Sequence, residues 1–210
     1  MKPAYSLQSI CQECLEPHIH NDFVIRSINL DDENNLNRDF LDLKLNRIKC
    51  PFCKNEYTFE TNMVIFSPSH RFAVKVNPET YRSPDLAPDS VPEYVFQEKF
   101  RFREVNFQIE AIEKCRIFLD GLDDIYIEFL KYRFFEDKDT LPFDEINMIY
   151  TSRDSEFLYF TKYDYNNNVI DKFRIPVHLY DVTNINYPTE NIWHRINRTN
   201  VNQYISDKER

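Results

Sequence analysis

The stretches Cys11-Gln12-Glu13-Cys14 and Cys50-Pro51-Phe52-Cys53 hold four of the five cysteines of this 210-residue chain. Each has the spacing Cys-x-x-Cys, which lets both sulfurs of a pair face one point, and 35 residues separate the two pairs. Two such pairs are typical of a tetrahedral site in which four thiolates bind one ion. The sequence therefore predicts a structural Zn²⁺ site whose ligands are Cys11, Cys14, Cys50 and Cys53.

Three other interpretations of these cysteines remain open. The first is a redox pair, although redox motifs usually occur singly at the start of a helix. The second is a degenerate site that holds no metal. In the third, His18 or His20 replaces one cysteine ligand. The fifth cysteine, Cys115, falls on the apolar face of an expected helix, where a small buried hydrophobic residue is a simpler interpretation than a nucleophile.

The composition argues against several classes of protein. Gly121 is the single glycine, so the chain has no glycine-rich loop for binding phosphate. No hydrolase, kinase or metalloprotease motif is present, and we expect no enzymatic activity. The sequence predicts neither a signal peptide nor a membrane-spanning helix. Because the cysteines resemble metal ligands more than a disulfide framework, the expected location is the cytoplasm.

The net charge of −9 bears on the kind of partner. An acidic surface is repelled by nucleic acid and by anionic membranes, unless a local basic patch overrides the total. The segment from Glu104 to Glu145 has 12 acidic and 5 basic residues and so carries −7 of this charge. Such a concentration of negative charge usually belongs to a solvated helix face. The functional alternative is an acidic surface that docks on a basic protein. The acidic residues considered include Glu110, Glu113, Asp120, Asp123, Asp124, Glu128, Glu136, Asp137 and Asp139.

Alternating and β-branched patterns predict strands in the first half of the chain, and polar residues around Asn34 predict a short helix over about 34–42. The prolines between residues 77 and 92 indicate a linker or a surface loop. The expected strands span residues 22–30, 43–48, 57–59, 63–66, 72–76 and 95–102.

The pattern then changes to helical. Asn106 is the expected N-cap of a helix that ends at Gly121, and Asp123 or Asp124 starts a second helix that continues to about residue 135. Strands are expected over 146–150, 157–163 and 169–175. The fold class is therefore α+β, with a zinc-ribbon-like β-rich first half, a central helical pair and antiparallel C-terminal strands. We divide the chain into a domain over 1–140 and a β-rich extension over 141–210 that packs on it.

The chain resembles the CpXC family. Cys50-Pro51-Phe52-Cys53 matches the motif that names the family, and residues 45–49 resemble the strand that enters it. The segments 103–114, 121–124 and 127–131 resemble the second half of the family's domain, so the likeness covers about residues 9–135. Leu15 and Lys54 stand where the family has a glycine after each cysteine pair. The resemblance implies a zinc ribbon, and it implies no activity.

We predict an acidic, zinc-stabilised, non-enzymatic module that binds another protein. The expected partner is a basic protein, such as a nucleic-acid-handling enzyme, and the expected role is inhibition of the immunity or anti-CRISPR type. The alternative is a zinc-ribbon regulator that binds nucleic acid through the basic residues Lys44, Arg47, Lys49 and Lys54. An unrecognised enzyme is the third hypothesis: Asp123, Asp124 and Glu128 would be its carboxylates, although acidic residues at a helix start more often act as caps.

Overall fold

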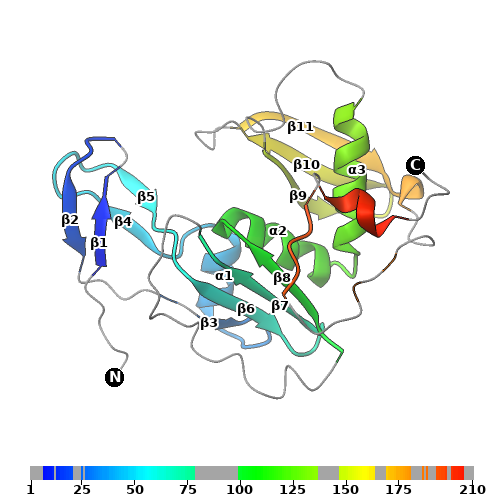
Figure 1. The fold of residues 1–210 in the computed structure, drawn as a ribbon, viewed down its shortest axis with the longest axis horizontal. Helices are drawn as coiled ribbons and strands as arrows, with labels where there is room; N and C mark the ends of the chain where they lie inside the picture. The colour runs from blue at the N-terminus through cyan, green and yellow to red at the C-terminus, as the bar shows by residue number, and fades with distance from the viewer. Residues whose placement is uncertain are drawn as a thin grey trace.

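The computed structural model describes residues 7–11, 13–20, 25, 27–78, 99–136, 147–163, 169–180, 186, 188, 193–197 and 200–205. Its mixed sheets and three helices confirm the α+β class, with hairpins first, helices in the centre and antiparallel strands at the end (Figure 1). Among the described residues, no helix has the length and apolarity needed to cross a membrane.

Two small antiparallel hairpins form a lobe at one side of the molecule (Figure 1). The first pairs β1 (Leu7–Ile10) with β2 (Pro17–His20), and the second pairs β4 (Arg47–Lys49) with β5 (Glu56–Thr58). Each cysteine pair lies in the loop of one hairpin. We call these four strands and their two loops the hairpin lobe.

A four-stranded sheet of order β3-β6-β7-β8 forms the centre of the fold. Its strands are β3 (Ser27–Asn29), β6 (Met63–Ser67), β7 (Phe72–Val76) and β8 (Arg101–Val105). The β6–β7 hairpin is antiparallel, and the two outer pairings are parallel. Helix α1 (Asn35–Leu41) precedes the sheet's second strand, and its N-cap is Asn34, whose side chain accepts a hydrogen bond from the backbone of Asn37.

Hydrogen bonds between residues close in the chain define the end of the first central helix and the start of the second. Helix α2 (Gln108–Leu119) ends at Gly121, which has a φ of 70°. The backbone N–H groups of Gly121 and Leu122 donate to the carbonyls of Phe118 and Ile117, which is a Schellman motif. Helix α3 (Asp124–Glu136) starts after Asp123, whose carboxylate accepts from the first backbone N–H groups. Asp123 is therefore the cap that the sequence predicted.

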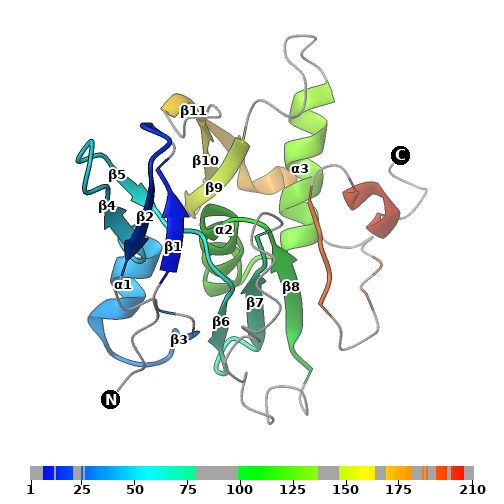
Figure 2. The ribbon, with the colours of Figure 1, turned by 60° about the vertical axis from the view of Figure 1, so that its left-hand side comes forward.

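The C-terminal strands form an antiparallel sheet of order β11-β10-β9, as predicted. They are β9 (Asn147–Arg153), β10 (Phe157–Tyr163) and β11 (Val169–Pro176), and a 3₁₀ turn, η2 (Val177–Leu179), follows them. A second 3₁₀ turn, η3 (Val201–Tyr204), packs near α3. In Figure 2 this sheet lies between α3 and the hairpin lobe.

Two apolar cores hold these layers together. The larger core joins one face of the central sheet to α1, α2, α3 and the C-terminal strands, and Phe72, Phe118, Tyr150 and Phe160 are among its largest side chains. The smaller core covers the other face of the central sheet, where Trp193 packs edge-on against Phe102 with ring centroids 5.2 Å apart.

Several predicted boundaries are wrong. The strand expected over 43–48 begins only at Arg47, because Leu43 and Asn46 have φ values of 57° and 53° and form turns. Of the strand expected over 22–30, residues 22–24 and 26 lie outside the described residues, and β3 is Ser27–Asn29. The N-cap of α2 is Phe107 and not Asn106. Most of the expected linker and the start of the strand expected at 95 lie outside the described residues.

Glu60 lies against the start of α2, where its carboxylate accepts a hydrogen bond of 2.9 Å from the backbone of Gln108. Burial raises the pKa of Glu60 from 4.5 to about 7, although the Gln108 N–H favours the charged form. The folded state thus disfavours the carboxylate, so the stability that Glu60 contributes falls as the pH rises from 4.5 to 7.

We expect Glu60→Gln to raise the free energy of unfolding at pH 8 by about 1–3 kcal/mol and to leave it unchanged near pH 4.5. Urea unfolding at the two pH values measures the difference. Glu56→Gln, at an exposed glutamate, is the control and should change neither value. Equal stability of Glu60→Gln and the wild type at pH 8 would show that the ionised Glu60 carboxylate does not destabilise the folded protein.

Candidate functional site

The two cysteine loops have the same backbone hydrogen bonds. In the first loop, the N–H of Leu15 donates to the carbonyl of Cys11 over 2.9 Å, and the N–H of Cys11 donates to Glu16 over 3.2 Å. In the second, Lys54 donates to Cys50 over 3.1 Å, and Cys50 donates to Asn55 over 2.8 Å. Both loops therefore form the same tight turn and present their two sulfurs in the same direction.

The four sulfurs of Cys11, Cys14, Cys50 and Cys53 meet at one point. All four Sγ atoms lie within 4.8 Å of one another. The Sγ atoms of Cys11 and Cys53 are 3.6 Å apart, and those of Cys14 and Cys50 are 3.7 Å apart. A tetrahedral ion with bonds of about 2.3 Å to sulfur requires sulfurs about 3.8 Å apart. The four predicted ligands are thus positioned to bind a metal ion.

Backbone N–H groups lower the pKa of one cluster cysteine and so favour its thiolate form. Desolvation disfavours the Cys50 thiolate, but the N–H groups of Cys53 and Phe52 lower its pKa to about 6. For Cys53, the N–H of Asn55 lowers the pKa, but desolvation and the neighbouring sulfurs raise it to about 12. Four thiolates this close repel one another, so their full ionisation requires a bound cation.

Leu15 and Lys54, which replace the expected glycines, both have left-handed backbones, with φ values of 60° and 65°. The left-handed conformation costs a non-glycine residue about 1 kcal/mol or more of conformational free energy. We expect Leu15→Gly to stabilise the metal-bound protein by about 0.5–1 kcal/mol and to tighten metal binding. Competition with a zinc chelator and thermal unfolding measure the two effects.

Glu16→Gly is the matched control for Leu15→Gly. Glu16 is also exposed and next to the same loop, but it does not have a positive φ. Glycine there should weaken the protein slightly, since it only adds freedom to the unfolded chain. If Leu15→Gly behaves like Glu16→Gly, then the left-handed turn carries no strain that glycine can relieve.

The fifth cysteine takes no part in this cluster. Cys115 is fully buried in α2 within the main core, and burial raises the pKa of its thiol. It is therefore the small buried hydrophobic residue that the sequence predicted. The side chains of His18 and His20, the alternative ligands, are not among those that the structure describes.

A second polar cluster lies between β8, α2 and α3, where six charged side chains are at most 5% exposed. Three carboxylates face three cations, so the group is neutral. We call it the ionic network; its members are Arg103, Glu113, Lys114, Asp124, Glu128 and Lys131.

The contacts of the ionic network are close and shared. Arg103 donates twice to Asp124, over 2.7 and 2.8 Å. Lys114 donates to Glu128 over 2.7 Å and also lies 3.3 Å from Asp124. Burial alone would raise the pKa of Asp124, but Arg103 and Lys114 hold it below its usual range. These bonds join β8, α2 and the start of α3.

Lys131 links the last two carboxylates of the network. Its Nζ lies 3.0 Å from both oxygens of Glu113 and 2.9 Å from Oε2 of Glu128. Glu113 also accepts from the backbone N–H of Tyr150 over 2.6 Å, which ties β9 to α2. Burial nevertheless raises the pKa of Glu113, because desolvation and the neighbouring Glu128 carboxylate outweigh the attraction of Lys131 and Lys114.

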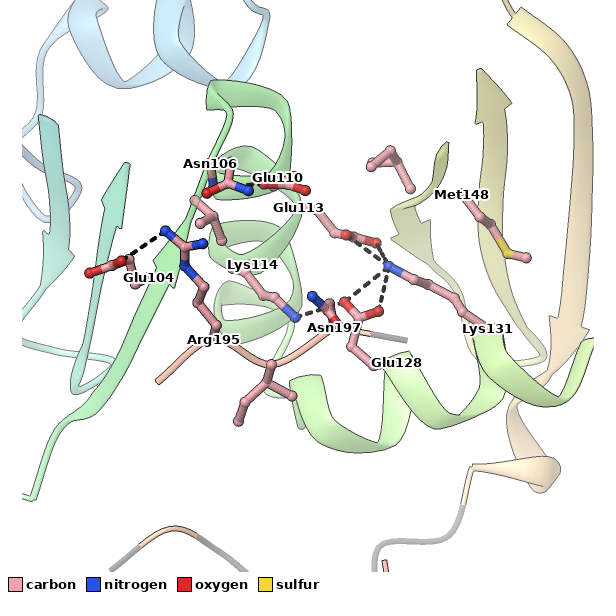
Figure 3. Close-up of a pocket in the computed structure, with 13 residues that line it drawn as sticks. Glu104, Asn106, Glu110, Glu113, Lys114, Glu128, Lys131, Met148, Arg195 and Asn197 are labelled. Atoms are coloured by element: carbon pink, nitrogen blue, oxygen red, sulfur yellow. Dashed lines mark hydrogen bonds and ion pairs between the residues drawn. The ribbon is translucent and has the colours of Figure 1, made fainter. Parts of the chain in front are cut away.

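This part of the network opens into a cavity of about 100 Å³ (Figure 3). The cavity is also lined by Asn197 and by Glu104, which accepts from Arg195 over 3.0 Å. Figure 3 shows two groups of these polar side chains: Glu113, Glu128 and Lys131 meet between α2 and α3, and Glu104 lies beside Arg195 near β8.

The ionic network corrects two predictions. Glu113, Asp124 and Glu128 belong to the segment expected to be a solvated or docking acidic surface, yet they are buried and paired. Asp124 was also a candidate helix cap, but its side chain binds Arg103 while Asp123 caps α3. One sequence signal was available: α3 has apolar residues around most of its circumference, which is typical of a buried helix.

Comparison with known proteins agrees with this geometry. The family model described as CpXC protein matches residues 10–131, which is more than half of the chain and includes all four cluster cysteines. No curated protein and no solved structure matches the chain. The segments on which the resemblance rested also supply all six side chains of the ionic network. This chain belongs to the CpXC family.

Proposed function

We propose that the protein is a non-catalytic binding module whose hairpin lobe is held together by Zn²⁺. A closed set of four thiolates is the ligand set of structural zinc sites and leaves no coordination position for a substrate. The role of such an ion is to fix the two loops relative to each other, since their own hairpins are short.

The observation that carries the proposal is the position of three exposed apolar side chains. Ile10, Leu15 and Phe52 are 62%, 73% and 58% exposed. Each is next to a cluster cysteine in the sequence, so the ion would hold all three in place. Exposed apolar side chains gathered on one rigid element are typical of a surface that contacts another protein.

The charges near these residues favour a basic partner. Glu13 and Glu16 are exposed beside the apolar residues of the first loop. Across the second hairpin, Lys49 lies 3.9 Å from Glu56, and Lys54 donates to a backbone carbonyl, which weakens that region as a surface for nucleic acid. Inhibition of a nucleic-acid-handling enzyme, of the immunity or anti-CRISPR type, stays a prediction within this proposal.

The polar cavity offers the best argument for an enzyme, because it contains a buried glutamate of raised pKa. One feature argues against a catalytic role, because the carboxylates of Glu113 and Glu128 already accept from ammonium groups. We therefore interpret the cavity as a consequence of the ionic network that holds α2 and α3.

Affinity capture from the native host tests the proposal when the wild type is compared with Phe52→Ser. We expect the wild type to recover a basic protein in near-stoichiometric amount and Phe52→Ser to lose it, while both retain one equivalent of metal. Leu179→Ser, at an apolar residue that is 44% exposed on η2, is the matched control and should retain the partner. Loss in both variants, or in neither, would contradict a contact surface on the hairpin lobe.

A further inference from the structure

One face of the C-terminal sheet packs into the main core. On the packed face, Phe160 stacks on Phe173 with ring centroids 5.2 Å apart, and Phe173 lies 6.5 Å from Phe134 of α3. Because side chains alternate along a strand, Tyr159, Thr161 and Tyr163 of β10 share the opposite face.

The opposite face carries cations beside these aromatic rings. In the register of β10 and β11, Arg174 lies opposite Tyr159, and Lys172 lies opposite Thr161. Cross-strand partners project to the same side of a sheet, so both cations share the face with the tyrosines. Both are exposed, whereas Tyr159 and Tyr163 are half-buried.

Residues of this face, together with Phe160 and Phe173, line an open groove of about 500 Å³ that continues to Arg116 of α2. Among the described residues that line it, the charged side chains are Arg116 and Lys172, and none is a carboxylate. Asp154, which is not among the lining residues, accepts a hydrogen bond from the hydroxyl of Tyr159. In a chain of net charge −9, such a basic groove is a local exception to the overall charge.

We infer that this groove binds single-stranded nucleic acid. A sheet face with aromatic rings lets unpaired bases stack, and cations beside the rings neutralise the phosphates. Tyr159 and Tyr163 are four residues apart on one strand, about 13 Å at 3.3 Å per residue, which leaves room for stacked bases between and beside them. In duplex DNA the bases are paired and stacked on one another, so a duplex can contact only the cations of the groove through its phosphates.

The inference goes beyond the proposed function, since it concerns a different surface from the hairpin lobe. It also differs from nucleic-acid binding at the second cysteine loop. Arg47 of β4 tests that location because it is an exposed cation on the hairpin lobe.

The experiment uses the full-length, metal-loaded protein and fluorescent ten-nucleotide oligo-U and oligo-dT at 50 mM salt. We expect saturable binding in fluorescence anisotropy and weaker binding to a duplex of equal length. Lys172→Glu should weaken binding about tenfold and lower the slope of log affinity against log salt by about one or more. Tyr159→Ala should weaken it about 5- to 100-fold.

Two matched variants keep the test specific. Tyr159→Phe retains the ring and should bind like the wild type, and Lys99→Glu reverses an exposed lysine at the entry to β8 and should do the same. Absence of binding to both oligonucleotides, or weakening by Arg47→Glu but not by Lys172→Glu, would overturn the inference. Displacement of the oligonucleotide by polyglutamate at equal charge concentration would also overturn it and indicate an acidic protein partner.

Discussion

Replacing Cys50 by serine will abolish metal binding and unfold the hairpin lobe. Cys50 is fully buried at the centre of the sulfur cluster, and its sulfur lies 3.7 Å from that of Cys14. Serine removes the soft thiolate that favours zinc. We expect metal content to fall from about one equivalent to near zero, as measured by elemental analysis of the purified protein.

The effect is large because the hairpin lobe has little apolar core of its own. Apart from cysteines, the buried apolar residues that the structure describes there are Ile48 in β4 and Phe59 directly after β5. Neither belongs to the two core clusters. Small metal modules draw on the order of 10 kcal/mol of folding free energy from zinc. The short hairpins should therefore not persist without the ion.

The rest of the protein should survive this change. The main core joins the central sheet, all three helices and the C-terminal strands without any cluster cysteine. Limited proteolysis should therefore cut Cys50→Ser within the hairpin lobe and leave a resistant fragment that contains α2 and α3. Cys115→Ala, at the buried cysteine outside the cluster, should retain metal and lose only about 1 kcal/mol. Full metal content in Cys50→Ser would contradict the assignment of a four-thiolate site.

The sequence predicted well wherever the determining residues are close together in the chain. The spacing within each cysteine pair leads to matching turns, and Gly121 and Asp123 end one helix and start the next through bonds within a few residues. The limits of β10 at residues 157 and 163 also follow from local alternation. Local chemistry was thus enough for the metal site and for most of the elements.

The same reasoning failed where distant segments meet. The sequence predicted a solvated or docking acidic surface for the segment that includes Glu113 and Glu128. Both glutamates are buried because α2 and α3 pair them with Lys114 and Lys131, and β9, 37 residues along the chain, donates to Glu113. Asn46 is a similar case: its side chain exchanges two hydrogen bonds with the backbone of Ile25, which fixes a turn where a strand was expected.

The second large effect concerns this ionic network. Lys131→Met removes the ammonium shared by Glu113 and Glu128 and leaves their carboxylates buried, with Lys114 as the remaining lysine partner of Glu128. Removal of one partner from a buried pair costs about 3–5 kcal/mol, because the other charge stays without compensation. We expect a loss of this size in urea unfolding at pH 7.5. Lys99→Met, at an exposed lysine, should change stability by less than about 0.5 kcal/mol.

The pH dependence of this variant identifies the cause of its loss. Without Lys131, the pKa of Glu113, already raised by burial, should rise further. A carboxyl whose folded pKa lies above its unfolded pKa destabilises the protein at high pH and loses that penalty as the pH falls. The difference from the wild type should therefore shrink between pH 7.5 and 5. Below about pH 4, protonation of Asp124 and Glu128, whose pKa values are lowered in the fold, weakens both proteins.

A second substitution separates buried charge from lost packing. Glu113→Gln in the Lys131→Met background removes the uncompensated charge and retains an oxygen that can accept from the N–H of Tyr150. We expect the double variant to recover at least half of the stability lost at pH 7.5 and to lose the pH dependence between 5 and 7.5. If the double variant is no more stable than Lys131→Met, then the lysine acts through its packed methylene chain, and the charges of the network do not hold α2, α3 and β9 together.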